Sequence, residues 1–148
     1  MNKFWLVLFA VLLVGSACEK DCEVKDENTI GGIAVSDKFS AIEITNDFRK
    51  QRFYWFLNQS SMPNGLLVSL DGGKNYGEVD FEKYQVLGYY AVGNCEVSFQ
   101  GNVALDDANK WVNYTMEVEE CGDCEIRRER MNWVLIPTVP DGYTVQFN

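Results

Sequence analysis

The feature that most constrains the fold of this chain is an alternation of apolar and polar residues in its second half. Within residues 111–119, Val112, Tyr114, Met116 and Val118 occupy every second position, and the residues between them are mostly polar. A period of two places such residues on one face of a β-strand. The pattern therefore predicts an antiparallel strand with one buried face and one polar face.

A second alternating segment precedes this strand. Val97, Phe99, Val103 and Leu105 also follow a period of two, and residues 106–110 (Asp-Asp-Ala-Asn-Lys) have the composition of a turn. Two alternating runs joined by a short polar turn predict a β-hairpin. Further strands are predicted over residues 84–92, 131–136 and 143–147, so that this half of the chain forms a five-stranded antiparallel meander.

Residues 29–70 have weaker secondary-structure patterns. Residues 29–35, 39–44 and 66–70 resemble short strands. Residues 48–58 follow the capping sequence Thr-Asn-Asp and favour a short helix, although the aromatic run at 53–57 would also suit a buried strand. The chain is thus expected to be mainly β, an antiparallel meander or sandwich of seven or eight strands, with one short helix packed on it. An α+β fold is the alternative.

The amino terminus has the pattern of a secretory signal. Lys3 precedes an apolar run of 11 residues, and the small residues 15–17 follow it. At about 1.5 Å per residue such a helix covers roughly half of a ~30 Å hydrocarbon core, so a permanent transmembrane helix is disfavoured. We expect residues 1–17 to be removed and residues 29–148 to form a single β-rich domain. An ordinary signal peptide, cut to release a soluble protein, is the alternative.

Small residues followed at once by Cys18 resemble the lipobox of bacterial lipoproteins, although Gly15 stands where that pattern commonly has Leu. The resemblance implies a diacylglycerol on the Cys18 thiol and an acylated amine. Glu19, Lys20 and Asp21 resemble the export tag of surface lipoproteins in the Bacteroidetes group. Because seven of the ten residues 19–28 are charged, residues 18–28 are expected to form a lipidated tether, or simply a solvated spacer. The expected location is the bacterial outer membrane. The sequence does not decide between its periplasmic side and its cell-surface side.

Charge and composition limit the possible functions. The 12 basic and 22 acidic residues after residue 17 give a net charge of −10, which disfavours nucleic acid as a partner. The chain has no histidine, so it lacks the commonest general base and the commonest metal ligand. We therefore predict a non-catalytic protein without a cofactor or metal. A small hydrolase that uses two carboxylates is a further alternative.

The cysteines after residue 18 form an even set: Cys22, Cys95, Cys121 and Cys124. In an exported protein such a set favours disulfides, and the three possible connectivities stay open. Cys121 and Cys124 form a Cys-x-x-Cys motif, but the acidic residues around it would raise a thiol pKa, and no second such motif or His pair completes a metal site.

Two features are candidates for partner binding. Arg127, Arg128 and Arg130 form a basic cluster in an acidic chain, and they either bind an anionic partner or offset the acidic residues 117–125 across a hairpin. Trp111 lies on the polar face of its strand, so it is either covered by a second layer or available as a contact residue.

Residues 79–90 (Val-Asp-Phe-Glu-Lys-Tyr-Gln-Val-Leu-Gly-Tyr-Tyr), a loop with Gly93, a hairpin and residues 133–137 (Trp-Val-Leu-Ile-Pro) together resemble small Bacteroidetes lipoproteins. They also resemble the carboxy-terminal domain of proteins that stabilise a surface protease complex. This chain has Gly93-Asn94-Cys95 where that family tends to have a Gly-Gly-Tyr-type loop. The resemblance implies a β-rich module for protein association. The expected function is thus a membrane-anchored lipoprotein with a binding domain, and the alternative is a structural or envelope-assembly lipoprotein.

Overall fold

The computed structural model describes residues 29–36, 38–44, 48–62, 64–122 and 125–148. Within them the chain forms nine strands and one short 3₁₀ helix. In chain order these are β1 (Thr29–Gly32), β2 (Ser40–Glu43), η1 (Phe48–Lys50), β3 (Phe53–Phe56), β4 (Leu66–Ser69), β5 (Tyr84–Asn94), β6 (Glu96–Asp106), β7 (Trp111–Cys121), β8 (Arg127–Pro137) and β9 (Thr144–Phe147). This arrangement confirms the prediction of a mainly β fold.

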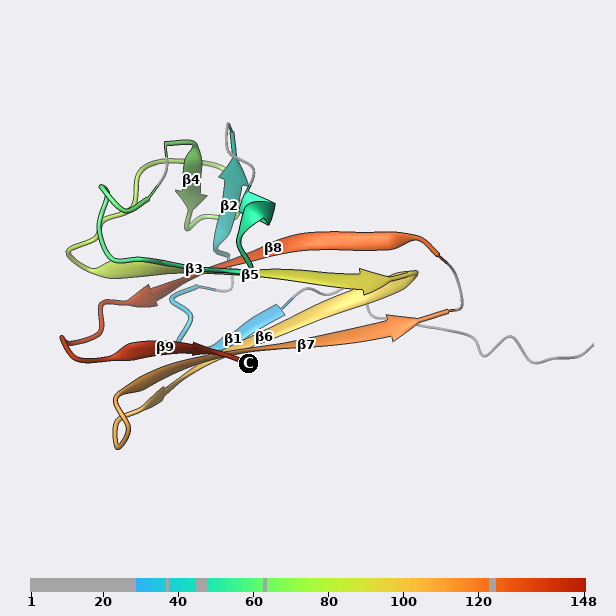
Figure 1. The fold of residues 1–148 in the computed structure, drawn as a ribbon. Helices are drawn as coiled ribbons and strands as arrows, with labels where there is room; N and C mark the ends of the chain where they lie inside the picture. The colour runs from blue at the N-terminus through green and yellow to red at the C-terminus, as the bar shows by residue number, and fades with distance from the viewer. Residues whose placement is uncertain (1–28, 37, 45–47, 63, 123–124) are drawn as a thin grey trace, which may run out of the picture.

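The strands form three layers (Figure 1). A four-stranded sheet has the order β1-β6-β7-β9, and a three-stranded sheet has the order β3-β5-β8. These two sheets pack face to face as a sandwich. The antiparallel β2–β4 pair covers the outer face of the three-stranded sheet near one of its ends.

The three-stranded sheet is buried on both faces over residues 85–89 of β5 and 132–136 of β8. One apolar cluster, which includes Leu87 and Ile136, lies between this sheet and the four-stranded sheet. A second cluster, which includes Val86 and Leu135, lies between the sheet and the β2–β4 pair. Successive residues on β5 and β8 therefore point into different cores. This double burial explains why both strands contain continuous apolar runs instead of an alternating pattern.

The helix predicted over residues 48–58 is wrong. Only η1 is helical, and residues 53–56 form β3, which pairs antiparallel with β5. Tyr54 and Phe56 pack on the cluster beneath the β2–β4 pair, whereas Trp55 packs on the cluster inside the sandwich. Side chains on both faces of β3 contact an apolar cluster, although Phe53 is 37 % exposed. Local periodicity could not distinguish this case from a helix.

The predicted hairpin between β6 and β7 is confirmed, but the pairing expected of a simple meander is not. β5 pairs with β8 and belongs to the other sheet, and β9 pairs parallel with β7. Only Cys95 separates β5 from β6, and its φ of 59° lies in the left-handed region. The chain changes from one sheet to the other at this residue. This end of the sandwich, where β5 and β7 finish and β6 and β8 begin, is called the distal end below.

The apolar faces predicted for β6 and β7 are buried only in part. Phe99, Val103, Val112 and Tyr114 lie in the core, but Val118 is 39 % exposed because it lies toward the distal end. The distal half of the sandwich extends beyond the layer formed by the β2–β4 pair (Figure 1).

A glycine in the three-stranded sheet makes room for a buried tryptophan. A Cβ atom on Gly88 would lie 2.2 Å from the Trp133 ring, whose Nε1 donates a hydrogen bond of 2.9 Å to Glu43 of β2. We predict that Gly88→Ala displaces the indole and lowers the free energy of unfolding by about 1–3 kcal/mol, as overpacking does in other cores. Urea unfolding followed by tryptophan fluorescence measures this loss.

The matched control is Gly77→Ala, because a Cβ atom there would meet no atom within 4 Å. The control variant should unfold close to the wild type. Equal destabilisation by the two variants would show that the contact with Trp133 is not the cause.

Candidate functional site

The edges of the sheets differ greatly in length. Among the described strands, six lie at a sheet edge, and five of these (β1, β2, β3, β4 and β9) have four residues each. The sixth, β8, has 11 residues. Short edge strands protect a protein from unwanted strand pairing, and a long exposed edge is a site where another strand can add. β8 therefore provides the longest stretch of edge backbone in the described part of the molecule.

Two hydrogen bonds define which backbone groups of β8 face the edge. The Val35 N–H donates to the Leu135 carbonyl from outside the sheet, at 2.9 Å. The Tyr90 N–H donates to Arg52 on the β3 side of β5, so Tyr90 does not bond to Met131, its register partner on β8. Because backbone groups alternate between the two sides of a strand, the odd-numbered residues of β8 direct their N–H and C=O groups to the free edge.

The segment that contains Val35 crosses the edge of β8 at Leu135, and no described strand pairs with residues 127–133 on that side. Within the described ranges, no backbone hydrogen bond reaches this stretch from outside the sheet. A cleft of about 290 Å³ lies beside it, and we call it the edge cleft. Its lining combines residues 130–134 of β8 with residues of β1, β2 and the segment between them, namely Thr29, Ile30, Ala34, Ser36, Phe39, Ser40 and Ala41.

Basic side chains lie along this edge. Arg127 pairs with Glu129 at 2.6 Å, and the hydrogen bond to Glu129 raises the pKa of the Tyr90 hydroxyl. Arg128 and Arg130 are exposed and have no ion pair with any described residue. Arg130 also lines the edge cleft.

The structure corrects one interpretation of the arginine cluster. The cluster does not offset the acidic residues of β7 across a hairpin, because β7 and β8 belong to different sheets and β8 pairs with β5. The Glu120 carboxylate instead accepts a hydrogen bond of 2.9 Å from the backbone N–H of Asn94 on β5.

Cys95 and Cys121 meet at the distal end. They form an isolated parallel β-bridge. A Cβ atom on Gly122, next to Cys121, would lie 3.8 Å from the Cys95 sulfur. Cys95 is only 6 % exposed, so its side chain lies inside the sandwich.

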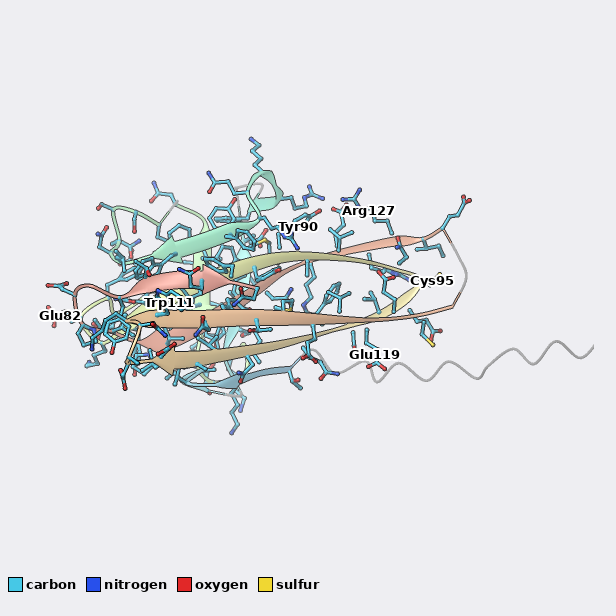
Figure 2. All side chains as sticks on the ribbon, turned by 60° about the horizontal axis from the view of Figure 1, so that its bottom comes forward. Glu82, Tyr90, Cys95, Trp111, Glu119 and Arg127 are labelled. Carbon is cyan, nitrogen blue, oxygen red and sulfur yellow. The ribbon has the colours of Figure 1, made fainter. Side chains whose placement is uncertain are left out.

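The candidate residues for partner binding lie at opposite ends of the sandwich. Figure 2 shows Trp111 near one end, and Arg127 and Cys95 toward the other. Trp111 is 40 % exposed at the start of β7, so none of the described layers covers it. The remaining predicted residues, Cys18, Glu19, Lys20, Asp21, Cys22 and Cys124, lie outside the described residues.

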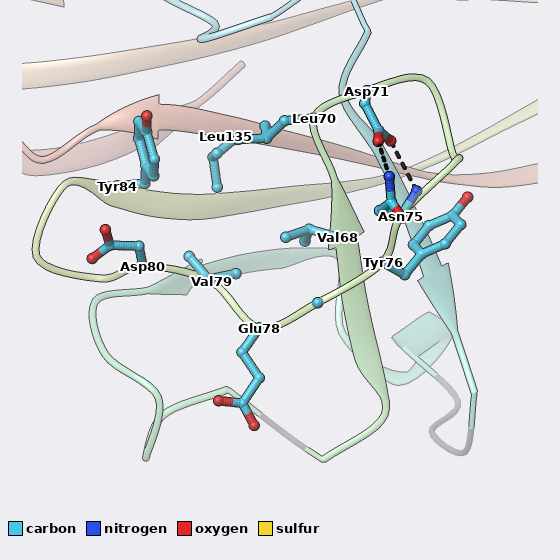
Figure 3. Close-up of a pocket in the computed structure, with 11 residues that line it drawn as sticks. Val68, Leu70, Asp71, Asn75, Tyr76, Glu78, Val79, Asp80, Tyr84 and Leu135 are labelled. Carbon is cyan, nitrogen blue, oxygen red and sulfur yellow. Dashed lines mark hydrogen bonds between the residues drawn. The ribbon is translucent and has the colours of Figure 1, made fainter.

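A second cleft, of about 410 Å³, lies where the β2–β4 pair meets one end of the three-stranded sheet. Val68, Val79, Tyr84 and Leu135 form an apolar lining, and Figure 3 shows Glu78 directed away from it. The cleft has room for an apolar group.

The carboxylates at the rim of this second cleft are engaged in local structure. Hydrogen bonds from Ser69 and then Asn75 hold the pKa of Asp71 well below its usual value. Figure 3 shows the bonds between Asp71 and Asn75. Asp80 bonds to Lys83 at 2.7 Å, and this bond lowers the pKa of Asp80. Neither carboxyl group has the raised pKa of a general acid. Sequence reasoning missed both clefts, because each is lined by segments far apart in the chain.

Some arrangements do not occur in the described part of the chain. No group of three His, Cys, Asp or Glu side chains there could hold a metal ion. The only helix there, η1, has three residues, so these residues include no helix that could span a bilayer. Comparison of the chain with protein-family models, with curated proteins and with solved structures finds no match.

Proposed function

We propose that this protein is a lipid-anchored protein of the bacterial outer membrane that acts by binding another protein along the edge of β8. The observation that carries the proposal is the contrast between this edge of 11 residues and the other described edge strands of four. An unpaired strand edge beside a cleft offers backbone donors and acceptors to an extended segment of a partner.

The anchor is proposed from the leader sequence. Residues 1–17 have the pattern of a secretory signal, and Cys18 is the proposed lipidation site. Ten residues lie between Cys18 and Thr29. The eleven Cα–Cα steps from Cys18 to Thr29, at most ~3.6 Å each, would keep the start of β1 within about 40 Å of the anchor. In this proposal the β-rich domain faces the partner while the acyl chains hold it at the membrane.

A structural or envelope-assembly lipoprotein is the second candidate, and a small hydrolase is the third. The long edge favours binding, because a protein with a purely structural role has no need of an unprotected strand. The carboxylates around the second cleft give a hydrolase no support, because Asp71 and Asp80 have lowered pKa values. The resemblance to small surface lipoproteins and to stabilisers of protease complexes is consistent with protein association.

The edge proposal predicts a position-specific crosslink in intact cells. Thr29 lines the edge cleft, whereas Lys74 lies in the exposed loop after β4. With a photoreactive benzoylphenylalanine at position 29 we expect a discrete adduct with a second protein, and at position 74 we expect none. Immunoblotting after irradiation measures the adducts, and equal adducts at the two positions would refute binding at the edge.

The proposed lipid anchor predicts that fatty acid is incorporated into the protein at Cys18. Cells grown with radiolabelled palmitate should label the wild-type protein, and Cys18→Ser should abolish the label and release the protein from the membrane fraction. Cys22→Ser is the matched control, because it removes a nearby thiol that the lipobox pattern does not select. Labelling that persists in Cys18→Ser would contradict the proposed anchor.

We infer that Cys95 and Cys121 form a disulfide, because they face each other in a β-bridge at the junction of the two sheets. A crosslink that closes a loop of this length is expected to contribute about 3–4 kcal/mol to stability. Cys121→Ala should therefore lower the free energy of unfolding by that amount in urea titrations. Cys124→Ala should have a much smaller effect, and the opposite ranking would indicate a different connectivity.

A further inference from the structure

We propose that the partner segment that adds to β8 is extended and acidic, with carboxylates at alternate positions that pair with Arg128 and Arg130. This inference rests on the proposed function and specifies the chemistry of the partner. It follows from the length of the free edge, the placement of the two arginines and the protection of the other edges.

The first step concerns length. Seven residues of β8, 127–133, lie beyond the point where Val35 bonds to Leu135. At about 3.3 Å per residue they extend over roughly 20 Å, which matches a strand of average length. Four of the seven, the odd-numbered ones, direct both backbone groups to the edge, so a partner strand could form a ladder of several hydrogen bonds there.

The second step concerns charge. Arg128 and Arg130 share the face of β8 on which Val134 and Ile136, further along the strand, meet the four-stranded sheet. Neither arginine has an ion pair with a described residue, so both guanidinium groups remain available to a ligand. Residues opposite each other on neighbouring strands are close enough to interact, so Asp or Glu at every second position of a partner would meet these arginines.

The third step explains why an acidic segment would select this edge. The whole chain has a net charge of −9, and the uncovered distal part of β7 has Glu117, Glu119 and Glu120. On the exposed side of β5, the Asn94 N–H is already bonded to Glu120. An acidic strand would be repelled at these sites and attracted only beside the arginines. This repulsion elsewhere would make binding of the strand specific for the edge of β8.

A second copy of this chain fits the edge less well. If two β8 strands paired antiparallel over all of residues 127–133, Arg130 would lie directly opposite Arg130 of the other copy. Like charges in opposite positions of a strand pair are destabilising. The charge pattern therefore favours an acidic partner over a symmetric dimer.

Three seven-residue peptides test the inference on the full chain, purified with its anchor in detergent micelles. The peptides alternate Val with Glu, with Gln or with Lys, and fluorescence polarisation measures their dissociation constants. We expect the Glu peptide to bind about tenfold more tightly than the Gln peptide, from two cross-strand charge pairs, and the Lys peptide to bind most weakly.

Paired variants separate the contribution of charge from that of the backbone. The double variant Arg128→Gln/Arg130→Gln should remove the preference for Glu over Gln, whereas Lys74→Gln/Lys110→Gln, which removes the same charge from exposed sites away from the edge cleft, should retain it. Glu129→Pro removes an N–H that faces the edge, and Glu129→Ala removes the same side chain but keeps that N–H. Only the proline variant should lose peptide binding.

If Glu129→Pro does not fold, N-methylation of the Glu peptide provides the same test, because methylation on one set of alternate nitrogens should abolish binding and methylation on the other should not. Equal binding of the Glu and Gln peptides, with sensitivity to the proline, would overturn the acidic partner but leave binding at the edge in place. Failure of every peptide to distinguish Glu129→Pro from Glu129→Ala would overturn both. Self-association of the full chain that only the proline abolishes would assign the edge to a second copy.

Discussion

Burial of the three-stranded sheet on both faces is the constraint on which the rest of the structure depends. β5 and β8 place Leu87 and Ile136 in one core, and Val86 and Leu135 in the other. Each such side chain contributes about 1.5–3 kcal/mol when fully buried, so neither face can remain in water. The four-stranded sheet must cover one face and the β2–β4 pair the other. Trp133, which lies against Gly88 and bonds to Glu43, connects this central sheet to its outer cover.

The candidate binding edge follows from the same arrangement. The chain passes from β1 in one outer layer to β2 in the other, and on the way it crosses β8 at Leu135. This crossing covers one end of β8 and leaves the distal residues 127–133 at the edge of the sheet. Because the β2–β4 pair does not reach the distal half, that half has less apolar cover, and a bond between Cys95 and Cys121 would restrain it where the two sheets meet.

Sequence patterns predicted individual strands well where one face meets water. The β6–β7 hairpin was predicted because alternating residues such as Val112 and Tyr114 face the core while their neighbours face solvent. The prediction of a helix over residues 48–58 failed because side chains on both faces of β3 contact an apolar cluster, so its apolar run has no period. The prediction of a five-stranded meander was wrong because the chain passes from one sheet to the other at Cys95. Local residue patterns do not encode such a change. Of the candidate site, the sequence revealed the arginine cluster and Cys95, but not the edge beside them.

The sequence by itself determined the mainly β fold, the acidic charge and the leader-like amino terminus, because these depend on residue identities and on periods of a few residues. Only the tertiary structure decided which strands pair, which strand remains at an edge, and that Cys95 lies beside Cys121. Those features depend on contacts between segments that are distant along the chain, and such contacts are selected by the joint burial of two cores. The position of Arg128 and Arg130 along an unpaired edge is a consequence of that burial and not of their own local sequence.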